Sequence, residues 1–172
     1  MFYVLVLLFL SLFTNTKISE GHMPKVPNLN EFLQRIQQIE SSNGQNMDHP
    51  VVQNGIQAGD QAIGRYGLMP NTVRELINRR RLQGTSTSEL QDLSNMPSDE
   101  MKQHIEANPD LEDDLAQQLA IKVTRDQQGD EDKAAYSWTN GHNLTPDKIS
   151  PEQLEDSPYV QKFRKLKGLM GE

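Results

Sequence analysis

The sequence predicts a mainly α-helical protein with a single domain. Its 172 residues suit one domain with a short removable segment at the start. After about residue 28, apolar residues recur mostly at the spacing of helical faces, and alternating runs of the strand type are scarce. The chain contains no cysteine, so we expect the fold to depend on a hydrophobic core rather than on disulfide bonds.

The first predicted helix begins after Asn28 and ends near Ser41. Glu31 follows Asn28 by three residues, which is the spacing of a capping box. Four apolar side chains then share one helical face: Phe32, Leu33, Ile36 and Ile39. Residues 46–66 are rich in Gly, Asn, Gln and Asp, and they predict no regular helix.

Six further helices are predicted from their starting and ending signals. A capping residue or a proline marks each start, at Met69-Pro70, Ser86, Pro97 or Ser98, Asn108-Pro109, Asp130 and Ser157-Pro158. Four of these helices are expected to end at a glycine, at Gly84, Gly129, Gly141 and Gly168. The helix that begins at Asn108-Pro109 is predicted to be the longest. The short helix that Ser86 caps is predicted to extend through Leu93.

The first 13 residues are almost wholly apolar and too short to span a bilayer comfortably. We expect residues 1–21 to be a signal peptide, with small residues at Ser19-Glu20-Gly21 near the cleavage site. The alternative is a retained N-terminal anchor, since no Lys or Arg precedes the apolar run. Residues 22–172 are then one exported domain, either periplasmic or secreted.

The charge pattern argues against several classes of partner. The formal net charge is −7, and no basic stripe with interleaved aromatic residues is visible, so we expect no nucleic-acid binding. The basic cluster at residues 79–81 is interpreted as a solvated helix end. The four histidines are scattered without metal-ligand spacing, so we expect no metal site. We also expect a monomer that needs no cofactor.

Glu40 is the most informative residue because it closes the first helix and opens the run Glu40-Ser41-Ser42. It follows Ile36 by four residues, so its side chain leans toward the buried face. A carboxyl group against apolar surface resists ionisation, and its pKa rises toward the value that a general acid needs near neutral pH.

Two further motifs follow in order, Gly64-Arg65-Tyr66-Gly67-Leu68-Met69-Pro70 and Ala134-Ala135-Tyr136-Ser137-Trp138-Thr139-Asn140-Gly141. Together with Glu40-Ser41-Ser42, this order resembles the lysozyme-like lytic transglycosylases (the SLT domain), which are related to goose-type lysozyme. The resemblance covers roughly residues 28–142. It implies a lysozyme-like domain with a small irregular or β lobe that lines a cleft. The implied substrate is the glycan strands of peptidoglycan.

The resemblance implies cleavage of the β-1,4 bond between N-acetylmuramic acid and N-acetylglucosamine, with Glu40 as general acid and base. In a transglycosylase one carboxyl group suffices, because the 6-hydroxyl of muramic acid attacks and an anhydro sugar forms. The alternative is a true lysozyme, including one that acts on de-N-acetylated peptidoglycan. A lysozyme needs a second carboxylate, for which Asp48 and Asp60 are the candidates. A rival interpretation is a non-catalytic wall-binding module.

The sequence departs from the family where Gly-Leu-Met is normally followed by Gln, because Pro70 stands there. Asn71 or Thr72 is the candidate to replace the contact of that Gln. Tyr136 is implied to form a hydrogen bond near the acid and fix its orientation, Tyr66 offers a ring to a sugar face, and Trp138 is interpreted as core. The full set of predicted substrate-binding residues is Ser41, Ser42, Asp60, Gly64, Tyr66, Gly67, Asn71, Tyr136, Asn140 and His142.

Overall fold

The computed structural model describes residues 28–53 and 58–170, and this part of the chain is mainly helical, as the sequence predicts. The predicted signal peptide lies outside the described residues. The elements are α2 (Leu29–Ser41), α3 (Pro70–Leu82), α4 (Ser88–Asn95), α5 (Ser98–Glu106), α6 (Pro109–Asp126), α7 (Glu131–Asn140), the 3₁₀ turn η1 (Pro146–Lys148), α8 (Pro151–Asp156) and α9 (Pro158–Met170). Within these residues, no helix has the length and apolar character that crossing a membrane requires.

Local signals explain most helix starts. The Asn28 side chain accepts a hydrogen bond from the Asn30 amide and donates one to Glu31, so α2 begins where the sequence predicts. The start of α4 differs from the prediction, because Thr87 rather than Ser86 is the capping residue. The Thr87 hydroxyl oxygen accepts the Leu90 amide at 3.3 Å.

The C-terminal part holds two elements that the sequence analysis did not predict, η1 and α8. The start of α8 has a complete capping box, in which Ser150 and Gln153 each accept the other's backbone amide. The last helix also continues past its predicted stop, since Gly168 lies within α9 and does not adopt positive φ. Without the left-handed conformation, a glycine does not end a helix.

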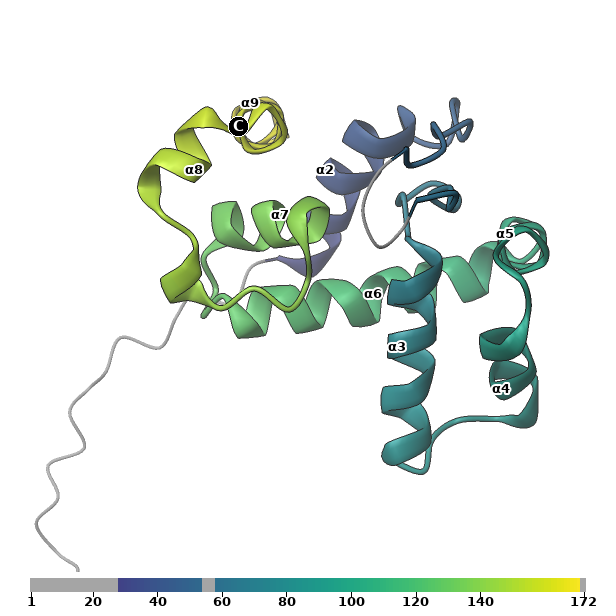
Figure 1. Cartoon of the computed structure of the whole chain (residues 1–172). Coiled ribbons are helices and arrows are strands. Elements are labelled where there is room, and N and C mark those ends of the chain that lie inside the picture. Colours follow the sequence, from purple (N-terminus) through teal and green to yellow (C-terminus); the bar gives the residue numbers. More distant parts are fainter. Residues whose placement is uncertain (1–27, 54–57, 171–172) are drawn as a thin grey trace, which may run out of the picture.

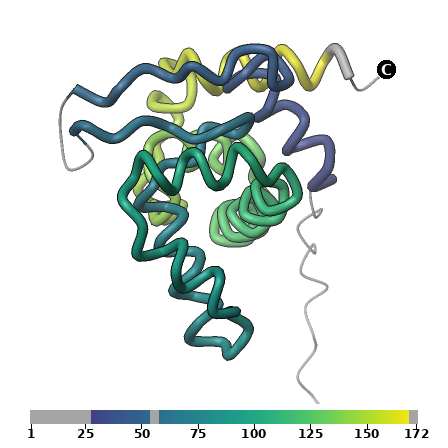
Figure 2. The backbone as a smooth tube through the Cα atoms, turned by 90° about the vertical axis from the view of Figure 1, so that its right-hand side faces the viewer, coloured from purple at the N-terminus to yellow at the C-terminus, as the bar shows by residue number. Residues whose placement is uncertain are grey.

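Helix α6 crosses the middle of the molecule and packs against α2, α3, α5 and α7 (Figure 1). Helices α7, α8 and α9 lie on one side of it, and α3, α4 and α5 lie on the other. The segment between α2 and α3 forms a lobe whose two arms run side by side (Figure 2). Among the described residues of this segment, the pairing consists of isolated antiparallel bridges, Val51 with Gln61 and Ile63 with Leu68. The segment is therefore irregular, and the cleft that it is predicted to line stays a prediction.

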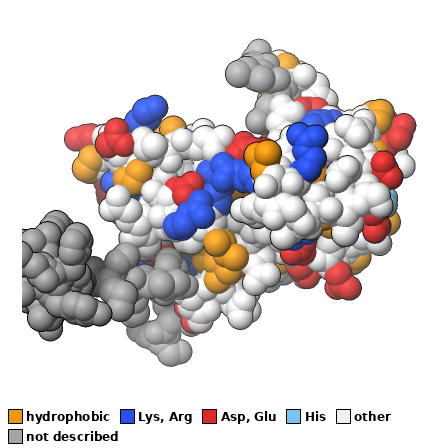
Figure 3. Space-filling model, turned by 90° about the horizontal axis from the view of Figure 1, so that it is seen from below, with side chains coloured by type: hydrophobic (Ala, Val, Ile, Leu, Met, Phe, Trp, Pro, Cys, Tyr) orange, Lys and Arg blue, Asp and Glu red, His pale blue; other side chains and the backbone are white. Residues whose placement is uncertain are grey.

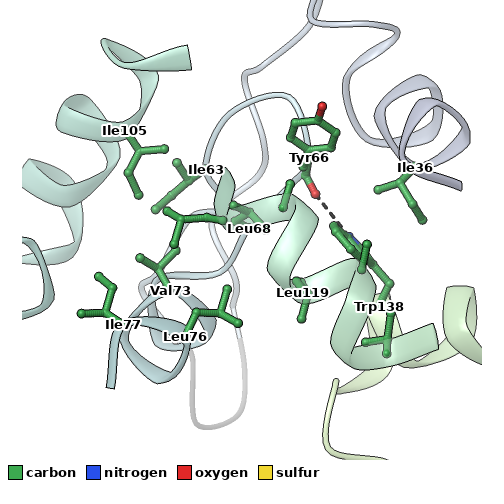
Figure 4. Packing of buried hydrophobic residues seen from close by; sticks show 14 of the residues in the cluster. Ile36, Ile63, Tyr66, Leu68, Val73, Leu76, Ile77, Ile105, Leu119 and Trp138 are labelled. Atoms are coloured by element: carbon green, nitrogen blue, oxygen red, sulfur yellow. Dashed lines mark hydrogen bonds between the residues drawn. The ribbon is translucent and has the colours of Figure 1, made fainter. Parts of the chain in front are cut away.

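The main core joins the two sides of the molecule beneath this lobe (Figure 4). Trp138 of α7 belongs to it, as predicted, and its indole N–H donates to the Tyr66 carbonyl at 3.2 Å. The Phe32 ring meets Trp138 and Phe163 edge-on, with centroid distances of 6.1 and 5.2 Å, and so ties α2 to α7 and α9. The start of α2 and the end of the chain are thereby fixed relative to each other.

The surface seen from below carries charges of both signs (Figure 3). Lys and Arg side chains lie in the middle of this face, with Asp and Glu side chains beside them and along its right-hand edge. At the end of α3, Arg79 pairs with Glu75 and Arg80 pairs with Asp114. Two of the three arginines of the basic cluster are thus neutralised by neighbouring carboxylates.

Candidate active site around Glu40

Glu40 lies in the last turn of α2, between α9 and the turn of residues 63–68. The Tyr159 hydroxyl of α9 donates a hydrogen bond to Glu40 Oε1 at 2.8 Å. The other carboxylate oxygen lies against Gly67, because a Cβ atom at Gly67 would be 2.5 Å from Oε2. The residue is partly exposed, and the contacts with Tyr159 and Gly67 hold its carboxyl group in place.

Burial raises the pKa of Glu40 above its ordinary value. The hydrogen bond from Tyr159 and the charges of His49 and Lys162 act in the opposite direction, and the effect of burial is the larger one. Burial and the neighbouring Glu40 also raise the pKa of Tyr159, so its hydroxyl remains a donor. Glu40 therefore retains its proton to a higher pH than an exposed glutamate, as a general acid requires.

The turn beside Glu40 depends on two glycines. Gly64 and Gly67 adopt φ angles of 65° and 63°, which residues other than glycine rarely adopt. A Cβ atom on Gly64 would lie 2.4 Å from the Glu112 carboxylate, just as one on Gly67 would collide with Glu40. Both glycines thus have a conformational role in the turn. The carboxylate of Glu112 lies against Gly64, and that of Glu40 lies against Gly67.

Side chains from four helices and the lobe hold this turn by its carbonyl groups and amides. The carbonyls of residues 64, 65 and 66 accept hydrogen bonds from His49 Nε2 at 2.7 Å, Ser41 Oγ at 2.8 Å and Trp138 Nε1 at 3.2 Å. The amide of Gly64 donates to Glu106 at 3.3 Å, and those of Arg65 and Tyr66 donate to Glu112. We call these five side chains, His49, Ser41, Trp138, Glu106 and Glu112, the turn clamp.

Sequence reasoning missed Glu112 and His49. Glu112 is 2% exposed and also pairs with the Arg65 guanidinium at 3.1 Å. A signal was present, because Glu112 shares the apolar stripe of α6 with Leu115 and Leu119, and an acidic residue in such a stripe requires partners. His49 is 9% exposed, but a single histidine in a polar loop gave no signal of its burial.

The tyrosine beside Glu40 is Tyr159, and the role that the resemblance implied for Tyr136 is wrong in this structure. The Tyr136 hydroxyl accepts a hydrogen bond from Gln153 at 3.2 Å. Its ring packs against the second apolar cluster, which consists of Ile149 after η1, Leu154 of α8 and Val160 of α9. Because α8 was not predicted, its competition for Tyr136 could not be foreseen.

Tyr66 does not offer its ring to a sugar. It is 7% exposed, belongs to the core, and donates its hydroxyl to Asp113 of α6 at 2.8 Å (Figure 4). Burial and the Asp113 carboxylate raise the pKa of Tyr66 well above its ordinary value. The prediction of a stacking surface is therefore replaced by a structural role, which is to anchor the turn to α6.

The two serines after Glu40 have different positions. Ser41 is buried and joins the end of α2 to the turn, since its hydroxyl donates to the Arg65 carbonyl and its oxygen accepts the Gly44 amide at 2.8 Å. Ser42 is exposed and adopts the left-handed conformation that ends α2. Contact of either serine with substrate stays a prediction.

Three other predicted residues lie around α3 and the end of α7. His142 Nε2 contacts Glu75 Oε2 at 2.7 Å, and its Nδ1 lies 3.5 Å from the Thr72 hydroxyl. Asn140 donates to the Tyr136 carbonyl at 3.1 Å, and Asn71 is exposed in the first turn of α3. These contacts tie α3 to the segment after α7, and the proposed binding of substrate there stays a prediction.

The two aspartates that could serve a hydrolase lie in the lobe. Asp48 is exposed and accepts a hydrogen bond from Gln61 at 3.4 Å, whereas Asp60 is partly buried and its carbonyl accepts the Val52 amide at 2.8 Å. The charges that act on the pKa of Glu40 are those of His49 and Lys162. Within residues 28–53 and 58–170, no cluster of three or more His, Cys, Asp or Glu side chains could hold a metal ion.

Comparison of the chain with protein-family models, with curated proteins and with solved structures found no match. A function for the chain is therefore inferred from the geometry around Glu40 and from the order of the three motifs.

Proposed function

We propose that this protein cleaves peptidoglycan glycan strands as a lytic transglycosylase, with Glu40 as general acid and base. The observation that supports this most directly is the setting of Glu40, a partly exposed carboxyl group whose pKa burial raises and whose orientation Tyr159 fixes. The helical fold with its small lobe between α2 and α3 is what a lysozyme-like domain requires.

In the proposed reaction, Glu40 donates its proton to the glycosidic oxygen while positive charge develops at the anomeric carbon of the muramic acid. The C–O bond to the leaving sugar breaks, and the ionised Glu40 then accepts the proton of the muramic acid 6-hydroxyl as that oxygen bonds to the anomeric carbon. Because Tyr159 donates to Oε1, the acidic proton belongs on Oε2. Oε2 lies against Gly67, and the missing side chain is what allows the carboxyl group to pack this close to the turn.

The alternative is a true lysozyme, including one that acts on de-N-acetylated peptidoglycan, and a third possibility is a wall-binding module without activity. A hydrolase needs a second carboxylate to activate water or stabilise the cation. Asp48 and Asp60 of the lobe are the candidates for that carboxylate.

The test is the digestion of purified peptidoglycan by the full chain and by Glu40→Gln. The amide keeps the size of the carboxyl group but cannot transfer a proton, so we expect at least a hundredfold loss of activity with little change in stability. Mass spectrometry of the products separates the two reactions, because anhydro ends lack one water relative to reducing ends. Equal rates for both proteins would rule out the catalytic assignment, and binding without digestion by either would favour the wall-binding module.

A further inference from the structure

A polar cavity of about 410 Å³ lies between α2, α6 and the turn beside Glu40. Its volume falls within the range of small-ligand sites in proteins, about 300 to 1,000 Å³. Glu40, Tyr159 and Gly67 are not among the described residues that line it. The cavity is therefore separate from the candidate active site, and the proposed reaction does not use it.

Four amide side chains line the walls of this cavity. Helix α2 supplies Asn30, Gln34 and Gln37, which the i, i+4, i+7 spacing places in one stripe along the helix. Helix α6 adds Gln117. In the described part of the chain these four amides have no side-chain hydrogen-bond partner, whereas the adjacent Gln118 is bound to α3. Each of the four thus keeps donors and an acceptor for a ligand.

The charged side chains of the cavity pair with each other. Arg65 and Asp113 line it, and the guanidinium donates to Asp113 Oδ1 at 2.9 Å. The Tyr66 hydroxyl donates to the same oxygen at 2.8 Å, and the Arg65 guanidinium lies 5.5 Å from the centroid of the Tyr66 ring. One cation and one anion therefore cancel in the walls, which favours a ligand without net charge.

The walls suit a saccharide better than a peptide. Peptides are commonly bound along an exposed sheet edge or in an apolar groove. Here the walls are two helices and a turn, and among the described lining residues only Leu33 and Tyr66 add apolar surface. Sugar hydroxyl groups both donate and accept, as the side-chain amides do. The half-buried Leu33 offers a surface for the C–H face of a sugar ring.

We propose that this cavity is a second saccharide site, which binds an uncharged sugar unit of a glycan. The sugar hydroxyls pair with the amides of α2 and α6. Gln37 precedes Glu40 by three residues, and Tyr66 directly precedes Gly67, so a glycan bound here lies next to the candidate active site. The role of holding a wall strand beside Glu40 rests on the proposed function, but the binding of a saccharide does not.

The experiment is an NMR titration of the full chain with the β-1,4-linked trimer of N-acetylglucosamine, which carries no charge. We expect the side-chain amide signals of the four lining residues to shift until they saturate, both in wild type and in Glu40→Gln. The signals are assigned by single substitutions to alanine.

The double variant Gln37→Ala/Gln117→Ala removes one amide from each helix. It should bind the trimer about tenfold or more weakly, the effect of losing two hydrogen bonds of ordinary strength. The matched control is Gln91→Ala, an exposed glutamine of α4 outside the cavity, and it should leave the affinity unchanged. Unchanged affinity in the folded double variant would overturn the proposal.

Shifts confined to the Gly67 amide and other signals around Glu40 would also overturn it, because the trimer would then bind only in the candidate active site. Equal binding of a terminally blocked, uncharged peptide of alanine and glutamine would refute the saccharide class. If the double variant does not fold, the absence of saturable amide shifts in wild type decides against the site. A wild-type protein that binds the trimer here but digests no wall sample would contradict the proposed function alone.

Discussion

At the scale of single residues, the site depends on which group touches each oxygen of Glu40. Tyr159 donates to Oε1 and Oε2 packs against Gly67, so the two oxygens have different surroundings. Neither neighbour is close to Glu40 in sequence, since Tyr159 follows it by 119 positions. The sequence singles out Glu40 by its helix and its apolar face, but contacts of this range required the folded chain.

Tyr159→Phe should slow turnover by about tenfold to a hundredfold, because the hydrogen bond that orients the acid is lost. The same bond lowers the pKa of Glu40, so its loss should also move the alkaline limit of activity to higher pH. The matched control is Tyr136→Phe, whose hydroxyl binds Gln153 and should leave turnover nearly unchanged. Rates measured across pH check both variants, and a larger loss in Tyr136→Phe would restore the role that the family resemblance implied.

Gly67→Ala should reduce activity strongly and destabilise the fold, because the new methyl group would collide with the Glu40 carboxylate. Gly84→Ala is the control, since Gly84 has a similar φ of 71° but no atom within 4 Å of the added Cβ. Gly84→Ala should therefore cost only the backbone strain, about 1 kcal/mol. Melting temperature and digestion rate together separate the two effects, and equal losses would contradict the collision.

At the scale of elements, the sequence predicted helices wherever the start and the buried face are encoded locally. Asn28, Pro70 and Asp130 mark starts that the structure has in the same place. Helix α8 was missed because its six residues carry little apolar periodicity, although the Ser150 capping box was readable. The turn clamp could not be predicted, because its members come from α2, the lobe, α5, α6 and α7 and meet only through tertiary packing.

Glu112→Gln tests whether α6 holds the turn. The amide keeps one acceptor oxygen for the backbone amides of Arg65 and Tyr66, which already share Oε1. It loses the charge and the Oε2 atom that pair with the Arg65 guanidinium, and places an NH2 group there instead. We expect a loss of about 2 to 4 kcal/mol in the free energy of unfolding. Asp114→Asn on the same helix breaks a surface pair with Arg80 and should cost below about 1 kcal/mol. Urea unfolding measures both, and similar costs would mean that the buried carboxylate is not needed.

At the scale of the whole molecule, two carboxyl groups should give opposite pH dependences of stability. Burial raises the pKa of Glu40, so its ionised form is penalised in the folded state, and that penalty grows as pH rises from the unfolded value through the folded one. Hydrogen bonds from His142 and Asn143 outweigh burial and lower the pKa of Glu75 to about 2. Glu75 therefore stabilises the fold above its unfolded pKa, and this contribution disappears as pH falls toward 2.

Urea unfolding across pH checks these signs. Glu40→Gln should match wild type near pH 4 and become more stable than it as pH rises, because the amide carries no penalty of ionisation. Glu75→Gln should be less stable than wild type at pH 7 and approach it near pH 2. A Glu40→Gln variant that loses stability with rising pH would contradict the raised pKa of the acid.

The number of carboxylates that the reaction needs is also a property of the whole molecule, since the lobe and α2 must supply them together. If the sugar's own 6-hydroxyl attacks, Asp48→Asn and Asp60→Asn should each keep most of the activity, because no water has to be activated. In a hydrolase, one of the two should lose about a hundredfold or more. Digestion rates and product masses must agree. Products with anhydro ends, together with active Asp48→Asn and Asp60→Asn variants, would support the transglycosylase. Products with reducing ends, together with a folded but inactive Asp60→Asn variant, would show that the lobe supplies a second catalytic carboxylate.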